Sequence, residues 1–178
     1  DPVNVRRAAQ TITNSLSEAD RAEATYFADR FRGFSQRIDQ LNRRIAECVR
    51  SVPARQRKIV TDHDSFSYFT DRYGIETVGT VIPALTTQAQ PSAGDLAELE
   101  QTIEDEKVTA IFSESSLSAG LAEAVSRDTG ASAGYSLYAD TLGPEGSGAE
   151  TWLGMMKTNT DSLMLGMTSS QRDCFGTG

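Results

Sequence analysis

The part of the chain after residue 57 alternates short apolar runs with amphipathic runs, four of each. The apolar runs have the length of buried strands, and the amphipathic runs have helical spacing. This order predicts an α/β domain with a four-stranded parallel sheet, flanking helices and right-handed crossovers. The expected strands are residues 58–61, 75–82, 108–113 and 132–138, and the expected helices are residues 65–73, 92–103, 117–129 and 150–167.

Short sequence signals support several of these boundaries. Gly74 can end the first of the helices in a left-handed conformation. Ser92, with Asp95 three residues later, resembles a capping box. Residues 143–148 are rich in glycine but lack the lysine of a phosphate-binding loop, so they are expected to be a connection. A loop is also expected over residues 84–91, and an irregular tail from residue 168.

Two helices are expected before the sheet. Asp1 as a cap and Pro2 in the first turn open a helix that runs to about Leu16. Ser17 and Asp20 can cap a new helix. After them, apolar residues recur in steps of four and three up to Pro53, which predicts one long helix. It is either a coiled-coil helix or a spine that packs across more than one lobe. Aromatic residues at its start favour the spine; its apolar stripe is Phe27, Phe31, Phe34, Ile38, Leu41, Ile45, Cys48 and Val52.

The charge of the chain is unevenly distributed. Residues 1–58 hold 12 of the 17 Lys and Arg and only 7 of the 25 acids, so the rest of the chain is strongly acidic. An acidic domain repels nucleic acid and attracts cations, and the arginines of the first part alternate with acids as on a solvated helix face. No nucleic-acid partner is therefore expected. No apolar run approaches the roughly 18 residues of a membrane span.

Three candidate metal-binding groups follow expected strands. His63, the only histidine, comes after residues 58–61, Glu114 after residues 108–113, and Asp140 after residues 132–138. Parallel strands place their carboxyl ends on one edge of a sheet, where such folds bind ligands. Imidazole nitrogen with carboxylate oxygen suits Zn²⁺ or Mn²⁺. The sequence therefore predicts a divalent metal site at this edge.

Simpler readings of the same residues stay open. His63 can be a cap or surface residue, Glu114 can start a helix, and Asp140 can cap a turn. The two cysteines, Cys48 and Cys174, are either separate buried thiols or one long-range disulfide formed in an oxidising compartment. With one histidine and no nucleophile elbow or His-Glu-x-x-His motif, the chain is not expected to be an enzyme.

Several motifs resemble those of the zinc and manganese solute-binding proteins of ABC transporters. The hallmark is the run from Ile59 to Phe69, followed by Arg72-Tyr73-Gly74. The other matching motifs are Gln90-Pro91-Ser92, Ile111-Phe112-Ser113-Glu114-Ser115, Asp140-Thr141-Leu142-Gly143 and the stretch from Trp152 to Asn159. The resemblance covers nearly the whole chain.

The resemblance implies a protein of two lobes that binds its metal between them and delivers it to an ABC permease. By position, His63 and Asp140 match the two ligands of the second lobe, and Glu114 matches an acid that supports the site without ligating the metal. A histidine at the position of His63 implies Zn²⁺ more than Mn²⁺. The family is extracytoplasmic, periplasmic or extracellular with or without a lipid anchor, which favours a Cys48–Cys174 disulfide.

In one respect the chain departs from the family, because the first lobe and its two histidine ligands are not in the sequence. The chain is therefore expected to be the C-terminal half of a longer protein that is a monomer. Residues 1–16 would be a helix of the missing N-terminal lobe, residues 17–53 the long interlobe helix, and residues 54–178 the C-terminal α/β metal-binding lobe.

Two other functions are compatible with parts of the sequence. A flavodoxin-like or receiver-like enzyme or switch would use Asp140 or Asp62 with a phosphate or cofactor, and it predicts five strands instead of four. An adhesin or interaction module would use the long helix and bind no metal.

Overall fold

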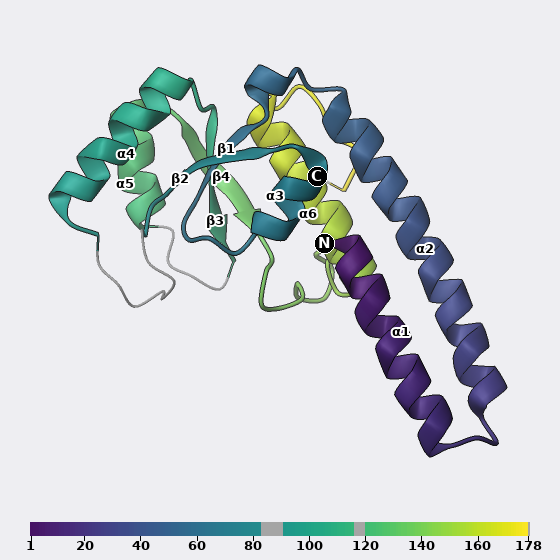
Figure 1. The fold of residues 1–178 in the computed structure, drawn as a ribbon. Coiled ribbons are helices and arrows are strands. Elements are labelled where there is room, and N and C mark those ends of the chain that lie inside the picture. The colour runs from purple at the N-terminus through teal and green to yellow at the C-terminus, as the bar shows by residue number, and fades with distance from the viewer. Residues whose placement is uncertain (83–90, 116–119, 178) are drawn as a thin grey trace. The chain divides into compact units, whose positions relative to one another are not determined.

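The computed structural model describes residues 1–82, 91–115 and 120–177 and divides the chain into two compact units, Asp1–Glu47 and Cys48–Gly178 (Figure 1). The expected loop over residues 84–91 and the start of the helix expected at residue 117 lie almost entirely outside the described residues. So does Gln90 of the Gln-Pro-Ser motif.

The first unit consists of helix α1 (Pro2–Ala19) and most of helix α2 (Ala24–Arg50), which continues into the second unit. The side chain of Asp1 accepts hydrogen bonds from the N–H groups of Val3 and Asn4, as expected of a cap. Helix α1 is three residues longer than predicted. Helix α2 begins later than predicted, since Asp20 accepts from the N–H groups of Ala22 and Glu23 and holds a turn between the helices.

The second unit contains the predicted four-stranded parallel sheet. Its strands are β1 (Lys58–Thr61), β2 (Glu76–Thr80), β3 (Ala110–Glu114) and β4 (Ser132–Leu137), in the spatial order β2-β1-β3-β4. A 3-10 turn (Ala54–Gln56) precedes β1. Helices α3 (Ser67–Tyr73), α4 (Ala93–Glu106) and α5 (Gly120–Thr129) connect the strands, and α6 (Trp152–Met167) follows β4. Over the described residues the sheet therefore has four strands, not the five of the flavodoxin alternative.

Helices cover both faces of this sheet (Figure 1). Val60 and Ile111 face α4 and α5, where Leu99, Ile103 and Val125 complete an apolar cluster. Consecutive strand residues point to opposite faces, so Phe112 faces the other side. There the missing side chain of Gly166 lets α6 approach closely, because a Cβ atom would lie 2.4 Å from the Phe112 ring.

Helix ends explain where the predicted boundaries are wrong. Lys107 adopts a left-handed conformation and the N–H of Val108 donates to Ile103 O, so the end of α4 occupies residues that were predicted to start β3. Helix α6 starts at Trp152 because the Thr151 side chain accepts from Gly154 N–H. Glu150, predicted as the first helical residue, instead accepts from Gly146 N–H in the preceding loop. The capping box of Ser92 and Asp95 and the left-handed Gly74 are confirmed.

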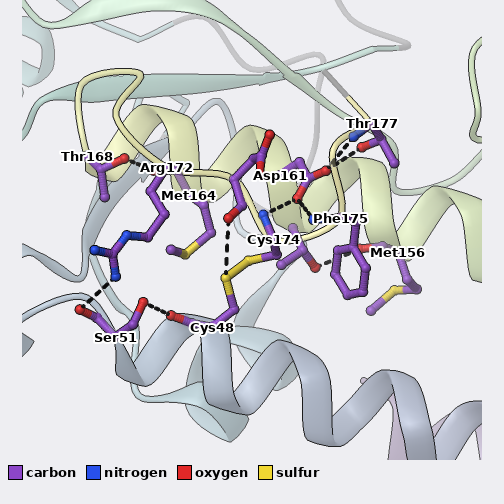
Figure 2. The surroundings of a disulfide bond; sticks show 12 residues. Cys48, Ser51, Met156, Asp161, Met164, Thr168, Arg172, Cys174, Phe175 and Thr177 are labelled. Carbon is purple, nitrogen blue, oxygen red and sulfur yellow. Dashed lines mark hydrogen bonds between the residues drawn. A yellow bond between two sulfur atoms is a disulfide. The ribbon is translucent and has the colours of Figure 1, made fainter.

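The C-terminal tail is fixed to the second unit by a disulfide between Cys48 and Cys174 (Figure 2). Of the two readings left open by the sequence, the long-range bridge is therefore confirmed. Beside it, buried Asp161 of α6 accepts hydrogen bonds from Cys174 N–H at 2.7 Å, Phe175 N–H at 2.9 Å, Thr177 N–H at 2.9 Å and the Thr177 hydroxyl at 2.6 Å. Burial raises the pKa of Asp161, but these hydrogen bonds outweigh it and leave the pKa below its ordinary value.

The anchoring carboxylate should make stability depend on pH. The pKa of Asp161 is lower in the folded than in the unfolded chain, so its contribution is present above the unfolded value, about 3.9, and is lost as pH falls through the folded value. We expect Asp161→Asn to be less stable than wild type at pH 7 and the deficit to shrink near pH 3, as measured by urea unfolding. Asp173→Asn, at an exposed neighbour, should behave as wild type. A deficit of equal size at both pH values would contradict this.

Candidate metal centre

The end of β1 places a buried carboxylate and an imidazole next to each other. The backbone of Asp62 continues the sheet, since its N–H donates to Phe112 O and its carbonyl accepts from Ile82 N–H. After Asp62 the chain turns toward α3, and the Thr61 hydroxyl donates to His63 O at 2.9 Å. Pairing on both sides of Asp62 therefore fixes the point from which the His63 side chain leaves the sheet.

The imidazole of His63 lies between two carboxylates. Its Nδ1 is hydrogen-bonded to Oδ1 of Asp62 at 3.1 Å, and its Nε2 lies 3.2 Å from Oε2 of Glu114. The His63 side chain is 12 % exposed, while those of Asp62 and Glu114 are 9 % and 2 % exposed. Water therefore screens these contacts less than it would at the surface.

Glu114 reaches this position because it is the last residue of β3, the strand next to β1. Its backbone N–H donates to Oδ2 of Asp62 at 2.6 Å, so the two strand ends are joined through one side chain. The expectation that parallel strands bring His63 and Glu114 together is confirmed by their 3.2 Å contact.

Asp140 lies three residues beyond β4 and is exposed. Buried Asn159 of α6 holds the chain leading to it: its side-chain oxygen accepts from Tyr138 N–H at 2.8 Å and its amide donates to Tyr138 O at 2.7 Å. Within residues 1–82, 91–115 and 120–177, no three His, Cys, Asp or Glu side chains converge on a point that could hold a metal ion. The structure thus gathers His63 and Glu114 but does not add Asp140 to them as a third group.

The contact between Asp62 and His63 is not among the features expected from the sequence, where Asp62 has a role only in the alternative of a phosphate-binding switch. An acid that continues a buried strand and precedes a histidine is nevertheless a signal that can be read from the sequence. Such an acid cannot be left unpaired in the interior at low cost. In the structure its carboxylate accepts from the backbone N–H groups of His63 and Glu114, and one oxygen lies 3.1 Å from the ring nitrogen Nδ1 of His63.

The last helix does not offer a second metal site. Its four methionines, Met155, Met156, Met164 and Met167, are all buried in the core. They fill the space between α6 and its neighbours, as methionine usually does. The candidate donors are therefore imidazole nitrogen and carboxylate oxygen, which suit zinc or manganese better than copper(I).

Comparison with known proteins gives consistent matches along the chain. The model of a family described as zinc-uptake complex component A, periplasmic (ZnuA), matches residues 1–165. The chain is 30% identical over 168 residues to the manganese-binding lipoprotein MntA of Halalkalibacterium halodurans, covering 94% of this chain and 55% of that protein. It is 31% identical over 161 residues to the zinc-binding protein TroA of Treponema pallidum, covering 87% of this chain and 51% of that protein.

A solved structure has the same fold. The periplasmic zinc-binding protein TroA from Treponema pallidum superposes with a TM-score of 0.79 at 29% identity, covering 89% of this chain and 58% of that one. The chain spans about half the length of the curated relatives that it matches. None of the helices in the described part of the chain is both long and apolar enough to cross a membrane.

Proposed function

Because the chain belongs to the ZnuA family of periplasmic zinc-uptake components, we propose that it captures a divalent transition metal outside the cytoplasmic membrane and delivers it to an ABC permease. Members of this family are substrate-binding proteins and not enzymes. The observation that carries the proposal is the nearly buried imidazole of His63, held between Asp62 and Glu114 at the carboxyl ends of β1 and β3.

The proposed ligands from this chain are Nε2 of His63 and a carboxylate oxygen of Asp140. Glu114 lies 3.2 Å from Nε2, and we assign it a supporting role: it balances the charge of the cation and limits the orientation of the ring. Asp140 is exposed, so it can move toward the metal at little cost in lost contacts. Buried Asn159 keeps the backbone two residues earlier in place.

Zinc is the proposed cargo, with manganese as the alternative. The related proteins named above are described as binding zinc or manganese, so membership of the family leaves the metal open. The support for zinc comes from the donor at residue 63, because imidazole nitrogen is a preferred zinc ligand while manganese favours oxygen-rich sites.

The proposal extends to the organisation of the protein. Residues 1–16 are assigned to an N-terminal lobe, residues 17–53 to the helix that joins two lobes, and residues 54–178 to the C-terminal metal-binding lobe. One observation bears on the second boundary: the two compact units, Asp1–Glu47 and Cys48–Gly178, separate most of the two helices from the part that holds the sheet. The protein is proposed to act as a monomer in the periplasm or at the outer face of the membrane, where an oxidising environment accounts for the disulfide.

Calorimetric titration with zinc and then with manganese tests the ligand set. Asp140→Asn removes a charged oxygen donor, so we expect zinc affinity to fall by about 10-fold or more. Glu145→Gln removes the same charge from another exposed position five residues away and should leave the affinity within about twofold of wild type. Equal losses in the two variants would mean that Asp140 acts only through long-range charge, which would contradict its assignment as a ligand.

A further inference from the structure

One carboxylate, that of Asp62, holds the ends of both strands that form the candidate site. Its Oδ1 accepts from His63 N–H at 2.9 Å and is hydrogen-bonded to His63 Nδ1 at 3.1 Å. Its Oδ2 accepts from Glu114 N–H at 2.6 Å. We infer that Asp62 is a positioning residue that selects the tautomer and orientation of His63 before the metal arrives; this inference rests on the proposed function.

The chemistry of imidazole gives this contact its consequence. A neutral imidazole has one N–H donor and one nitrogen with a free lone pair. An ionised carboxylate only accepts, and each ring nitrogen faces one: Asp62 lies at Nδ1 and Glu114 at Nε2. The carboxylate of Asp62 is fixed by two backbone N–H groups, so we expect it to keep the proton on Nδ1 in competition with Glu114 and to leave the lone pair of Nε2 for the metal. A metal-binding histidine whose other nitrogen donates to a carboxylate is a better and more rigidly placed ligand.

The surroundings of Asp62 hold its carboxylate against the His63 ring whether or not a metal is bound. Its backbone is paired with Phe112 on one side and Ile82 on the other. Only 6 % of the residue is exposed, and both carboxylate oxygens are engaged by donors. An amide cannot replace it, because asparagine offers one acceptor oxygen where the site presents donors to two.

The neighbouring acid provides a matched control. Asp64 follows His63 as Asp62 precedes it, but its side chain is exposed. Asp62→Asn and Asp64→Asn therefore each remove one negative charge next to the same histidine. Only the first removes a hydrogen-bond acceptor of the ring.

The ¹⁵N spectrum of the histidine ring reports the tautomer without ambiguity, because the chain has one histidine. In the metal-free wild-type chain at alkaline pH we expect the proton on Nδ1. In Asp62→Asn we expect a shift toward the Nε2–H form and a loss of about 10- to 100-fold in zinc affinity. Asp64→Asn should keep the wild-type tautomer and affinity. Amide spectra of each variant verify that it is folded.

Two outcomes overturn the inference. One is an Nε2–H tautomer in the wild-type chain, a result that does not depend on whether Asp62→Asn folds. The other is a folded Asp62→Asn with an unchanged ring spectrum and zinc affinity. If instead the ring responds to Asp62→Asn while the wild-type chain fails to bind zinc, the control of His63 by Asp62 is supported and the proposed metal-binding function fails.

Discussion

Replacing His63 with alanine is expected to abolish measurable zinc binding. His63 is the only imidazole in the chain, so no other residue can supply the nitrogen donor. Loss of a group that merely orients a metal-binding side chain already lowers metal affinity by about 10- to 100-fold. Loss of the metal-binding side chain itself should therefore lower zinc affinity by more than about 100-fold. Isothermal titration of wild type and His63→Ala with zinc, in a buffer that does not chelate, measures the difference.

Thermal unfolding gives an independent check of the same prediction. A ligand that binds only the folded state stabilises it by about 2.7 kcal/mol when its concentration is 100 times Kd. Zinc should therefore raise the Tm of wild type and leave that of His63→Ala unchanged. Because His63→Ala also leaves Asp62 and Glu114 next to a cavity, the metal-free Tm of the variant must be measured first. A zinc-dependent rise of equal size in both proteins would contradict the role of His63.

Removing the disulfide is expected to cause the largest loss of stability. The bridge joins residues separated by 126 positions, and a loop of that length restricts the unfolded chain by about 4 to 5 kcal/mol in the chain-entropy description. Measured effects of native disulfides fall in a range of about 2 to 5 kcal/mol. We expect Cys48→Ser/Cys174→Ser to lose stability within that range in urea unfolding.

Reduced wild-type protein is the control for this double variant. Dithiothreitol opens the same bridge while both cysteine side chains stay in place. The reduced protein and the variant should therefore unfold at similar urea concentrations. The tail should be the first region to exchange its amide hydrogens in both, since Asp161 would be its main remaining anchor. Equal stability of oxidised wild type and the double variant would contradict the prediction.

The arrangement of the sheet could be predicted from the sequence because apolar runs and helical spacing alternate without exception after residue 57. Strand β1 has the predicted bounds. The predicted boundaries are wrong where a backbone N–H group has two possible hydrogen-bond acceptors. Val108 reads as the start of a strand, but its N–H is taken by the end of α4. The choice depends on the left-handed conformation of Lys107, which lysine rarely adopts.

The sequence was sufficient to predict which strand ends form the candidate site, but not how the side chains there are oriented. Parallel topology alone places His63 near Glu114, and the structure has them in contact. The role of Asp62 depends on which way a side chain points just beyond the end of a strand, and this is set by pairing with Phe112 and Ile82. The place of Asp140 depends on the path of the chain after β4, which is set by two hydrogen bonds between the Asn159 side chain and the Tyr138 backbone. An acid before a histidine can be noticed in the sequence, but the direction of each side chain follows from contacts with residues distant in sequence.

The most direct test is anomalous diffraction at the zinc edge from crystals of the zinc-loaded protein. We expect the strongest anomalous peak about 2.0 to 2.1 Å from Nε2 of His63, with a carboxylate oxygen of Asp140 at about 2.0 to 2.2 Å from the same ion. Asp62 should still hold Nδ1. A peak elsewhere on the protein, with the imidazole unchanged between Asp62 and Glu114, would contradict the assignment of His63 as the residue that captures the metal.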